Sequence, residues 1–284
     1  MKKIIKKVRA PVRIDFAGGT TDIKPFTHKY GGAVLNAAID RYVYGTLIAT
    51  ERFTKLEYYA NIPTSSGLGT SSAMNDVWVA LITSITDKEK IAESVFKIEQ
   101  SISESKVNGK QDMYAASLGG INFMEFCGDE VKIQRLKLKP RVIKELEEHL
   151  VIVYSGKTHF SGKSNKVIID NLLKGKNDKE LLAIKQIAID MKNLLLKGDL
   201  YGFAHLINKE TEYRRKLSKI TVSPQLQNII DSGKRNGAVS AKICGSGGGG
   251  SVLFYAENPK KLKKFFGKRV IPFKFDFEGL TWMK

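Results

Sequence analysis

The pattern of hydrophobic and polar positions predicts a first half of the chain that is rich in strands. Residues 2–17 and 32–50 carry many apolar, β-branched and aromatic side chains and are expected to be strands. From residue 71 onward the apolar side chains recur at helical spacing, so a helix is predicted to begin there. Further elements are expected as a helix over 88–103, paired strands over 121–137 and a helix over 140–148.

The same pattern predicts a second half dominated by helices. A strand is expected at 150–154, helical patterns fill most of 165–231, and strands follow at 239–244 and 252–256 before a last helix and strand. We therefore predict two domains, 1–148 and 149–284. Because no internal repeat or long linker separates them, the two domains are expected to pack together and share one cleft.

Composition fits a chain that folds around its own core. Hydrophobic residues make up 42% of the 284 positions, charged residues make up 27%, and no apolar run is long enough to span a membrane. Lysines interrupt the apolar start, which argues against a secretory signal. Cys127 and Cys244 are too few for a disulfide framework and are expected to be small core residues. We expect a soluble, cytoplasmic protein that makes no use of a membrane.

The formal net charge of +18 favours anionic partners without choosing among them. Nucleic acid, membrane surfaces and phosphorylated metabolites would all be attracted. Nucleic-acid modules usually add clustered exposed aromatics or a reading helix, and the sequence has neither. Many lysines fall in helical stretches where a solvated face explains them, so the charge fits a small anionic metabolite without identifying it, and nucleic acid is not expected.

The segment 63–73 has the composition of a phosphate-binding loop. Gly67 and Gly69 let the backbone approach an anion, the following hydroxyl side chains can donate, and the helix predicted from residue 71 turns its positive end toward the loop. No Walker lysine follows, and the spacing is not that of a dinucleotide fold. Taken alone, the loop is equally well explained as a capped glycine turn. The residues assigned to nucleotide binding are Pro63, Ser65, Ser66, Gly67, Leu68, Gly69, Thr70, Ser71 and Ser72.

Three segments together resemble the motifs of the GHMP kinases, the family of galactokinase, homoserine kinase, mevalonate kinase and phosphomevalonate kinase. They are residues 10–22, 63–73 and 242–251. The runs 31–35 and 109–116 are similar to the heptose 7-phosphate kinase and fucokinase branch. The resemblance implies an ATP-dependent kinase with an α+β fold. Its N-terminal domain would be like ribosomal protein S5 domain 2, its C-terminal domain would be ferredoxin-like, and the active site would lie between them.

The resemblance also implies roles for individual residues. Asp112 falls at the catalytic aspartate, which orients the acceptor hydroxyl or takes its proton, and Arg13 falls at the neighbouring basic residue. Ser72 and Glu99 would hold Mg²⁺, although a solvated helix glutamate explains Glu99 nearly as well. Lys110 is a candidate neighbour of the Asp112 carboxylate. The resemblance further allows a homodimer, because members of the family often form dimers.

The acceptor half of the site is assigned more coarsely. Asp22 falls at a residue that contacts substrate hydroxyls in sugar-specific members, with Gly19 and Thr21 in the same turn. Gly247 and Gly248 are expected in the floor of the cleft. Arg214 is a candidate clamp for a substrate phosphate, since arginine favours bidentate contacts.

Two departures from the branch leave the acceptor open. The segment between Glu51 and Pro63 has only eleven residues, where the heptose kinases carry a longer insertion, and His159 replaces an arginine. A heptose 7-phosphate-like sugar phosphate, a fucose-like sugar and a mevalonate-type acid such as mevalonate 3-phosphate all remain candidates. A non-catalytic sensor with the same fold is an alternative, but the intact Arg13, Ser72 and Asp112 argue against it.

Overall fold

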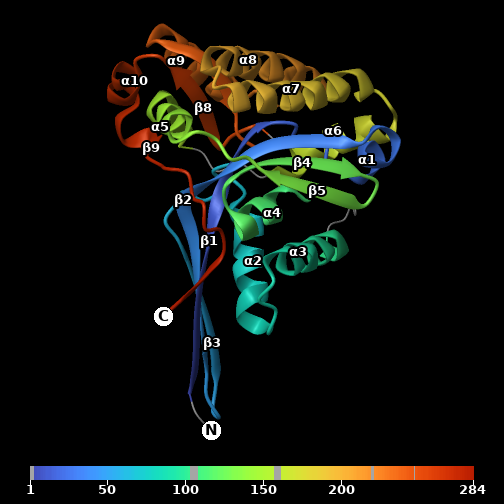
Figure 1. The fold of residues 1–284 in the computed structure, drawn as a ribbon, viewed down its shortest axis with the longest axis vertical. Coiled ribbons are helices and arrows are strands. Elements are labelled where there is room, and N and C mark those ends of the chain that lie inside the picture. Colours follow the sequence, from blue (N-terminus) through green and yellow to red (C-terminus); the bar gives the residue numbers. More distant parts are fainter. Residues whose placement is uncertain (1–2, 103–107, 157–160, 219–220, 246) are drawn as a thin grey trace.

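Two antiparallel sheets, each covered by helices, form the body of the molecule (Figure 1). The computed structural model describes residues 3–102, 108–156, 161–218, 221–245 and 247–284. His159, and residue 103 at the end of the helix predicted over 88–103, lie outside these ranges. No helix within the described ranges is long and apolar enough to cross a membrane.

The first sheet has the strand order β10-β1-β2-β4-β5, and β3 pairs with the remaining length of β2. Helices α2 and α4 pack against β1 and β2, and α3 packs against α2 and α4. The elements are β1 (Ile4–Ala17), α1 (Lys24–Tyr30), β2 (Gly32–Ala49), β3 (Thr54–Ala60), α2 (Thr70–Ile82), α3 (Lys88–Ile102), α4 (Gln111–Leu118), β4 (Ile121–Cys127), β5 (Glu130–Arg135) and β10 (Thr281–Met283).

The second sheet has the order β7-β8-β6-β9, which is the order of a ferredoxin-like βαββαβ unit. Helices α9 and α10 cover one face of this sheet, whereas α8 packs on β7 and α7 packs on β1 and β2. The elements are α5 (Pro140–His149), β6 (Leu150–Tyr154), α6 (Ser161–Leu173), α7 (Asp178–Lys197), α8 (Leu200–Leu217), α9 (Pro224–Arg235), β7 (Ala238–Ile243), β8 (Ser251–Ala256), α10 (Pro259–Phe266), the 3₁₀ turn η1 (Gly267–Arg269) and β9 (Val270–Ile271).

A continuous hydrophobic core joins the two halves of the chain. Phe16 on β1 lies 5.3 Å from Phe203 on α8 and 6.4 Å from Phe275, measured between ring centroids, and all three rings are buried. Phe275 belongs to the segment that leads back to the first sheet, where β10 pairs with β1. The two sheets are therefore tied together both by packing and by the returning chain.

The predicted long helices and strands are confirmed, and the short elements are where prediction fell short. Of the predicted strand 32–50, residues 32–49 form one strand, β2, because β1 pairs with it along nearly its whole length. No helix was predicted over 111–118, which forms helix α4. Its side chains are buried on almost every side and so show no amphipathic period. Neither β3 nor α1 was predicted. β3 is exposed on both faces and lacks the alternation of a half-buried strand.

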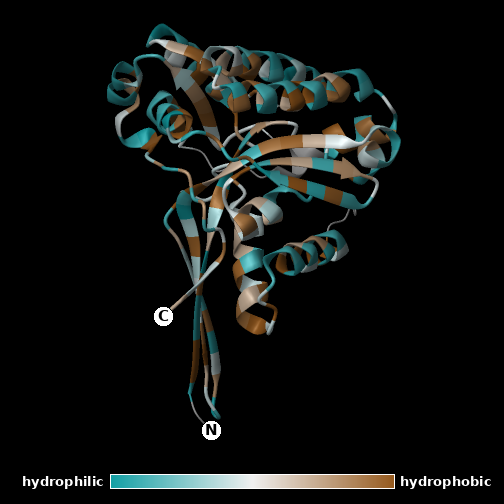
Figure 2. Ribbon diagram, in the orientation of Figure 1, coloured by the Kyte–Doolittle hydropathy of each residue, from teal (hydrophilic) through white to brown (hydrophobic). Residues whose placement is uncertain are grey.

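One part of the first sheet projects from the body as a three-stranded arm (Figure 1). It consists of the start of β1, the second half of β2 and all of β3, paired without a register break from Val43 to Ala60. Hydrophobic and hydrophilic residues mix along this arm, as Figure 2 shows. The arm is therefore held mainly by its strand pairing, with α2 packed against its base on β1 and β2.

We expect Phe16→Ala to lower the free energy of unfolding by about 3–5 kcal/mol, because it leaves a cavity in the core between the two halves. Urea unfolding followed by circular dichroism measures the change. Leu196→Ala, which removes an exposed side chain from α7, is the matched control and should stay within about 0.5 kcal/mol of the wild type. Equal losses in the two variants would contradict the role given to this core.

Candidate active site

A cavity of about 400 Å³ lies where the two halves of the chain meet. Its wall combines the turn after β1, the loop before α2, the start of α4, part of α6 and α8, and the glycine run after β7. The predicted site residues on this wall are Arg13, Gly19, Asp22, Ser65, Ser66, Gly67, Gly69, Thr70, Ser71, Ser72, Glu99, Asp112, Arg214 and Gly247. Segments distant in the sequence thus converge on one cavity.

Four predicted site residues do not line this cavity. Leu68 is fully buried in the core, and Pro63 lies off the wall. The Thr21 hydroxyl donates to the Gly18 carbonyl of its own turn and to the Ala33 carbonyl on β2, so it holds the turn against β2. The Gly248 N–H donates to the Thr221 carbonyl. These residues hold the loops whose neighbours face the cavity.

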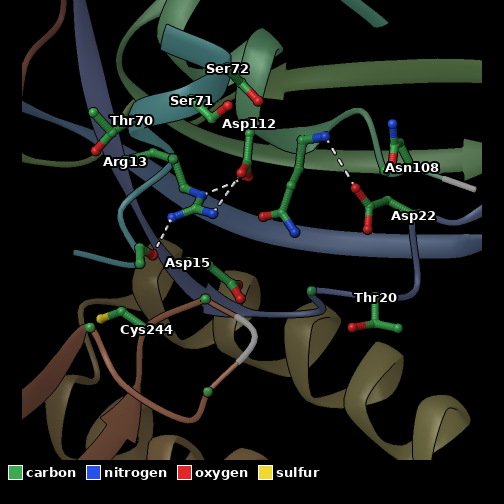
Figure 3. Close-up of a pocket in the computed structure, with 18 of the residues that line it drawn as sticks. Arg13, Asp15, Thr20, Asp22, Thr70, Ser71, Ser72, Asn108, Asp112 and Cys244 are labelled. Carbon is green, nitrogen blue, oxygen red and sulfur yellow. Dashed lines mark hydrogen bonds and ion pairs between the residues drawn. The ribbon is translucent and has the colours of Figure 1, made fainter. Parts of the chain in front are cut away.

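Arg13 and Asp112 form a bidentate ion pair at the centre of the wall (Figure 3). Arg13 Nε donates to Asp112 Oδ1 and Nη2 donates to Oδ2, each at 2.7 Å. Burial alone would lower the pKa of the Arg13 guanidinium, but Asp112 raises it above its usual value, so the group stays charged. The Asp112 side chain remains 27% exposed. The Asp112 carboxyl group therefore lies on the cavity wall, where it can contact a bound molecule.

The loop 63–73, which has the composition of a phosphate-binding loop, is held against Arg13 and against the glycine-rich segment 242–251. Arg13 Nη1 donates to the Gly67 carbonyl at 2.9 Å, and the Arg13 N–H donates to the Leu68 carbonyl. Gly67 has φ of +77°, and a Cβ there would lie 2.4 Å from the Cys244 carbonyl oxygen. Only glycine fits this approach. The loop therefore brings the free N–H groups at the start of α2 to the cavity, as an anion site requires.

Ser72 and Glu99 face one another at the α2 end of the cavity. The Ser72 hydroxyl donates to Glu99 Oε1 at 2.9 Å, and Asn75 Nδ2 donates to the same oxygen at 2.9 Å. Burial raises the pKa of the Glu99 carboxyl above its usual value, although these two hydrogen bonds oppose the shift. Hydroxyl and carboxylate oxygens at this spacing suit a hard divalent cation, so the residues present fit Mg²⁺.

Asp22 occupies the opposite end of the cavity, near Thr20 and Asn108 (Figure 3). Its Oδ2 accepts a hydrogen bond from the Gln111 N–H at 3.1 Å. Burial raises the pKa of the Asp22 carboxyl to about 6, even though this hydrogen bond favours the charged form. Near neutral pH the group can therefore exchange a proton and both accept and donate hydrogen bonds.

Arg214 lines the cavity but already has partners. It forms an ion pair with Glu210 at 2.6 Å, approaches Asp15 at 3.9 Å, and donates to the Gly19 carbonyl at 3.1 Å. Lys242 completes a buried cluster, 3.2 Å from Asp15 and 3.6 Å from Glu210. Although burial alone would raise the pKa of Asp15, Lys242 and Arg214 hold it below its usual range. Two acids and two bases thus balance their charges between β1, α8 and β7.

Lys110 does not face Asp112 in the structure. Its ammonium donates to Glu93 at 2.7 Å and to the Asp129 carbonyl at 2.9 Å, and its side chain is largely buried. The suggestion that Lys110 tunes the Asp112 carboxylate is therefore not supported by the geometry. The lysine instead anchors the start of α4 to α3 and to the turn after β4.

Sequence reasoning missed the buried cluster around Asp15. Asp15 follows Arg13 by two positions in a strand, so alternation alone places both side chains on the same face. Glu210 and Arg214 have the i, i+4 spacing of a helical ion pair. Lys242 gave no such signal, because its approach to Asp15 depends on how the two sheets pack. Gln111 was likewise missed, since its contribution to Asp22 is a backbone N–H.

Comparison with known proteins places these features in a family. The profile described as "GHMP kinases N terminal domain" matches residues 35–120, and the one described as "GHMP kinases C terminal" matches residues 191–268. D-glycero-alpha-D-manno-heptose 7-phosphate kinase of Campylobacter jejuni is 29% identical, covering 97% of this chain and 98% of that protein. The bifunctional fucokinase/GDP-fucose pyrophosphorylase of Arabidopsis thaliana is 23% identical over 97% of this chain and 32% of that protein.

A solved structure shares the whole architecture. The crystal structure of a D-glycero-D-manno-heptose 1-phosphate kinase from Bacteroides thetaiotaomicron is 26% identical, covers 99% of both chains and superposes with a TM-score of 0.75. The two-domain α+β fold and the similarity to the heptose kinase and fucokinase branch, both expected from the motifs, are thereby confirmed.

The raised pKa of Asp22 predicts that this carboxyl makes folding less favourable as the pH rises. In the folded chain Asp22 holds its proton up to about pH 6, whereas in the unfolded chain it releases it near 3.8. The stabilising contribution of the protonated form is thus complete below pH 3.8 and is lost as the pH rises through 6. Asp22→Asn cannot ionise, so its free energy of unfolding relative to wild type should increase by about 3 kcal/mol between pH 3 and 7.

Urea unfolding of both proteins across this pH range measures the difference. Asp129→Asn is the matched control, because ion pairs with Lys24 and His28 hold the pKa of that exposed carboxyl below its usual value. This control should show no relative gain with rising pH. A constant difference between wild type and Asp22→Asn at every pH would refute the assigned shift.

Proposed function

The chain belongs to the GHMP kinase family, and from that premise we propose that it transfers the γ-phosphate of ATP to a hydroxyl group of a small sugar phosphate. The observation that carries the proposal is the Arg13–Asp112 pair. It lies between the glycine loop at the start of α2 and the turn that holds Asp22, within one cavity. A kinase needs such an arrangement, because it must bring a nucleotide and an acceptor to one reacting centre.

In this proposal the loop 65–72 and the N-terminus of α2 bind the phosphates of ATP. Backbone N–H groups and three consecutive hydroxyl side chains supply the donors, and the helix dipole favours negative charge. Ser72 and Glu99 would hold Mg²⁺ together with phosphate oxygens and water. When bound, the ion neutralises charge on the phosphates.

Asp112 and Arg13 then act on the acceptor side of the transferred group. Asp112 orients the acceptor hydroxyl and takes its proton as the acceptor oxygen bonds to the γ-phosphorus, while the bond from that phosphorus to the bridging oxygen breaks and ADP leaves. Arg13 keeps its charge in the buried wall, so it can stabilise the negative charge on the transferred group while holding Asp112 in place. Little covalent chemistry falls to the protein, and positioning supplies most of the catalysis.

A sugar fits the acceptor end better than a simple carboxylic acid. Asp22, Asp15 and Asn108 line that end, and carboxylate and amide groups form hydrogen bonds with neighbouring hydroxyls. A mevalonate-type acid offers fewer hydroxyl groups to these side chains than a sugar does. The similarity to a heptose 7-phosphate kinase over nearly all of both chains supports the phosphorylated form of the sugar, as does the net charge of +18.

The acceptor can be identified by measuring ADP release with ATP and Mg²⁺ over a panel of acceptors. The panel comprises heptose 7-phosphate, fucose, galactose, homoserine, mevalonate, mevalonate 3-phosphate and mevalonate 5-phosphate. We expect the highest kcat/KM with the heptose phosphate. A higher value with mevalonate 3-phosphate would overturn the sugar assignment. Nucleotide binding without ADP release from any acceptor would favour a non-catalytic sensor.

Asp112→Asn should lower kcat by about 10²–10⁴-fold, because the amide cannot accept the hydroxyl proton. Its Kd for ATP should change little, since Asp112 lies outside the loop that binds phosphates. Steady-state kinetics and calorimetric titration with ATP measure the two effects. Asp129→Asn removes an exposed carboxylate elsewhere on the surface and should keep the wild-type kcat. Normal turnover in Asp112→Asn would exclude the proposed catalytic role.

Ser72→Ala and Glu99→Gln should each raise the Mg²⁺ concentration needed for half-maximal ADP release by at least about tenfold. The reason is that Ser72→Ala removes one proposed oxygen ligand, whereas Glu99→Gln removes the negative charge of the other. Titration of Mg²⁺ at saturating ATP is the measurement. Ser94→Ala is the matched control, because the Ser94 hydroxyl donates only to its own helix on the exposed side of α3. An unchanged Mg²⁺ dependence in both site variants would remove these residues from the metal site.

A further inference from the structure

Strand β3 is the outer strand of the arm formed by β1, β2 and β3, and its outer edge is open. Strand β3 pairs with β2 on one side, and no other strand of the described residues pairs with its outer side. Between Thr54 and Ala60 the register has no bulge and the sequence has no proline. Soluble proteins usually block such an edge with one of these devices. An open and regular edge is therefore available for pairing.

The hydrogen bonds at the two ends of the hairpin show which residues face outward. The Thr50 N–H donates to the Phe53 carbonyl, and the Asn61 N–H donates to the Tyr42 carbonyl. Phe53 and Asn61 thus use their backbone groups to bond to the β2 side of the hairpin. Because hydrogen-bonded residues alternate along an antiparallel ladder, the other odd-numbered residues between them also bond to β2. The intervening residues Thr54, Leu56 and Tyr58 therefore present their N–H and C=O groups on the open edge.

The side chains along this edge are complementary to a second copy of the same strand. Lys55 and Glu57 lie on one face of β3, 2.8 Å apart and each about half exposed. If two copies pair antiparallel with Leu56 opposite Leu56, each Lys55 lies opposite a Glu57 of the other copy. A shift to the next symmetric register would place either Lys55 opposite Lys55 or Glu57 opposite Glu57. Like charges directly opposite one another destabilise a sheet.

The exposed aromatic side chains of the arm fit the same register. Phe53 is 55% exposed and Tyr59 is 64% exposed. They lie on the same face as Lys55 and Glu57 and would come opposite one another at both ends of the paired segment. Aromatic pairs across neighbouring strands stabilise a sheet. On the other face, α2 packs over β1 and β2.

From these observations we propose that two copies of the chain form a two-fold symmetric dimer by pairing their β3 edges with Leu56 opposite Leu56. The contact joins the first sheets of the two copies into one continuous antiparallel sheet. It is isologous, because each pair occurs twice about the axis, and such a contact closes at two subunits. The cavity between the two halves of each chain does not include any residue of β3, so the dimer leaves its mouth open.

The test is sedimentation velocity of the intact chain over a range of concentrations, with charge variants of the edge. Wild type should approach a mass twice the 31.7 kDa of one chain. Lys55→Glu and Glu57→Lys each oppose like charges at both symmetric positions and should weaken the dimer by at least about tenfold in Kd. Mixed together, these two variants should form a heterodimer, since every opposing pair is again of opposite sign.

Leu56→Pro should abolish the dimer, because proline removes an outward N–H without removing a hydrogen bond to β2. Lys144→Glu makes the same charge change on α5, away from the arm, and should leave the dimer intact. Thermal unfolding of every variant shows whether it is folded. A wild-type chain that stays monomeric would overturn the proposal, as would a dimer that survives both Lys55→Glu and Leu56→Pro.

Discussion

The architecture of the site depends on one buried arginine. Arg13 is 5% exposed, and a buried guanidinium is tolerated only when its N–H groups and its charge are matched. Its partners are the Asp112 carboxylate at the start of α4 and the Gly67 carbonyl in the glycine loop. One side chain on β1 therefore ties the glycine loop before α2 to the start of α4 across the wall of the cavity. The same pairing leaves one face of Asp112 in contact with the cavity.

The second constraint is the buried cluster of Asp15, Glu210, Arg214 and Lys242. These four charges come from β1, α8 and β7, so they fix the first sheet against the second half of the chain. Removing one partner from such a cluster leaves an unmatched charge, which is strongly destabilising. The cluster and the Phe16 packing together set how the cavity walls face each other.

How much could be predicted from the sequence depends on whether the signal was local. Motif spacing was enough to place Arg13, Asp112 and the glycine loop in one site, and they line one cavity. The long helices and strands could be predicted from their periodicity. Helix α4 was missed because burial on nearly all sides removes the amphipathic pattern. The ion pairs of Lys242 and Lys110 were beyond prediction, since they arise from the packing of elements distant in sequence. Asp22 was identified as a site residue, but its raised pKa follows from burial, which the sequence does not give.

The return of β10 to the first sheet has a consequence for biosynthesis. Residues 281–283 pair with β1, and Phe275 bridges to Ile39, so these contacts join the earliest and latest parts of the chain. A ribosome that has released only the first 150 residues has therefore exposed a sheet whose β1 edge still lacks its partner. Contacts of such long sequence separation form slowly, and an unpaired edge is prone to association in the meantime. The completed fold of the N-terminal half thus waits for translation of the whole C-terminal half.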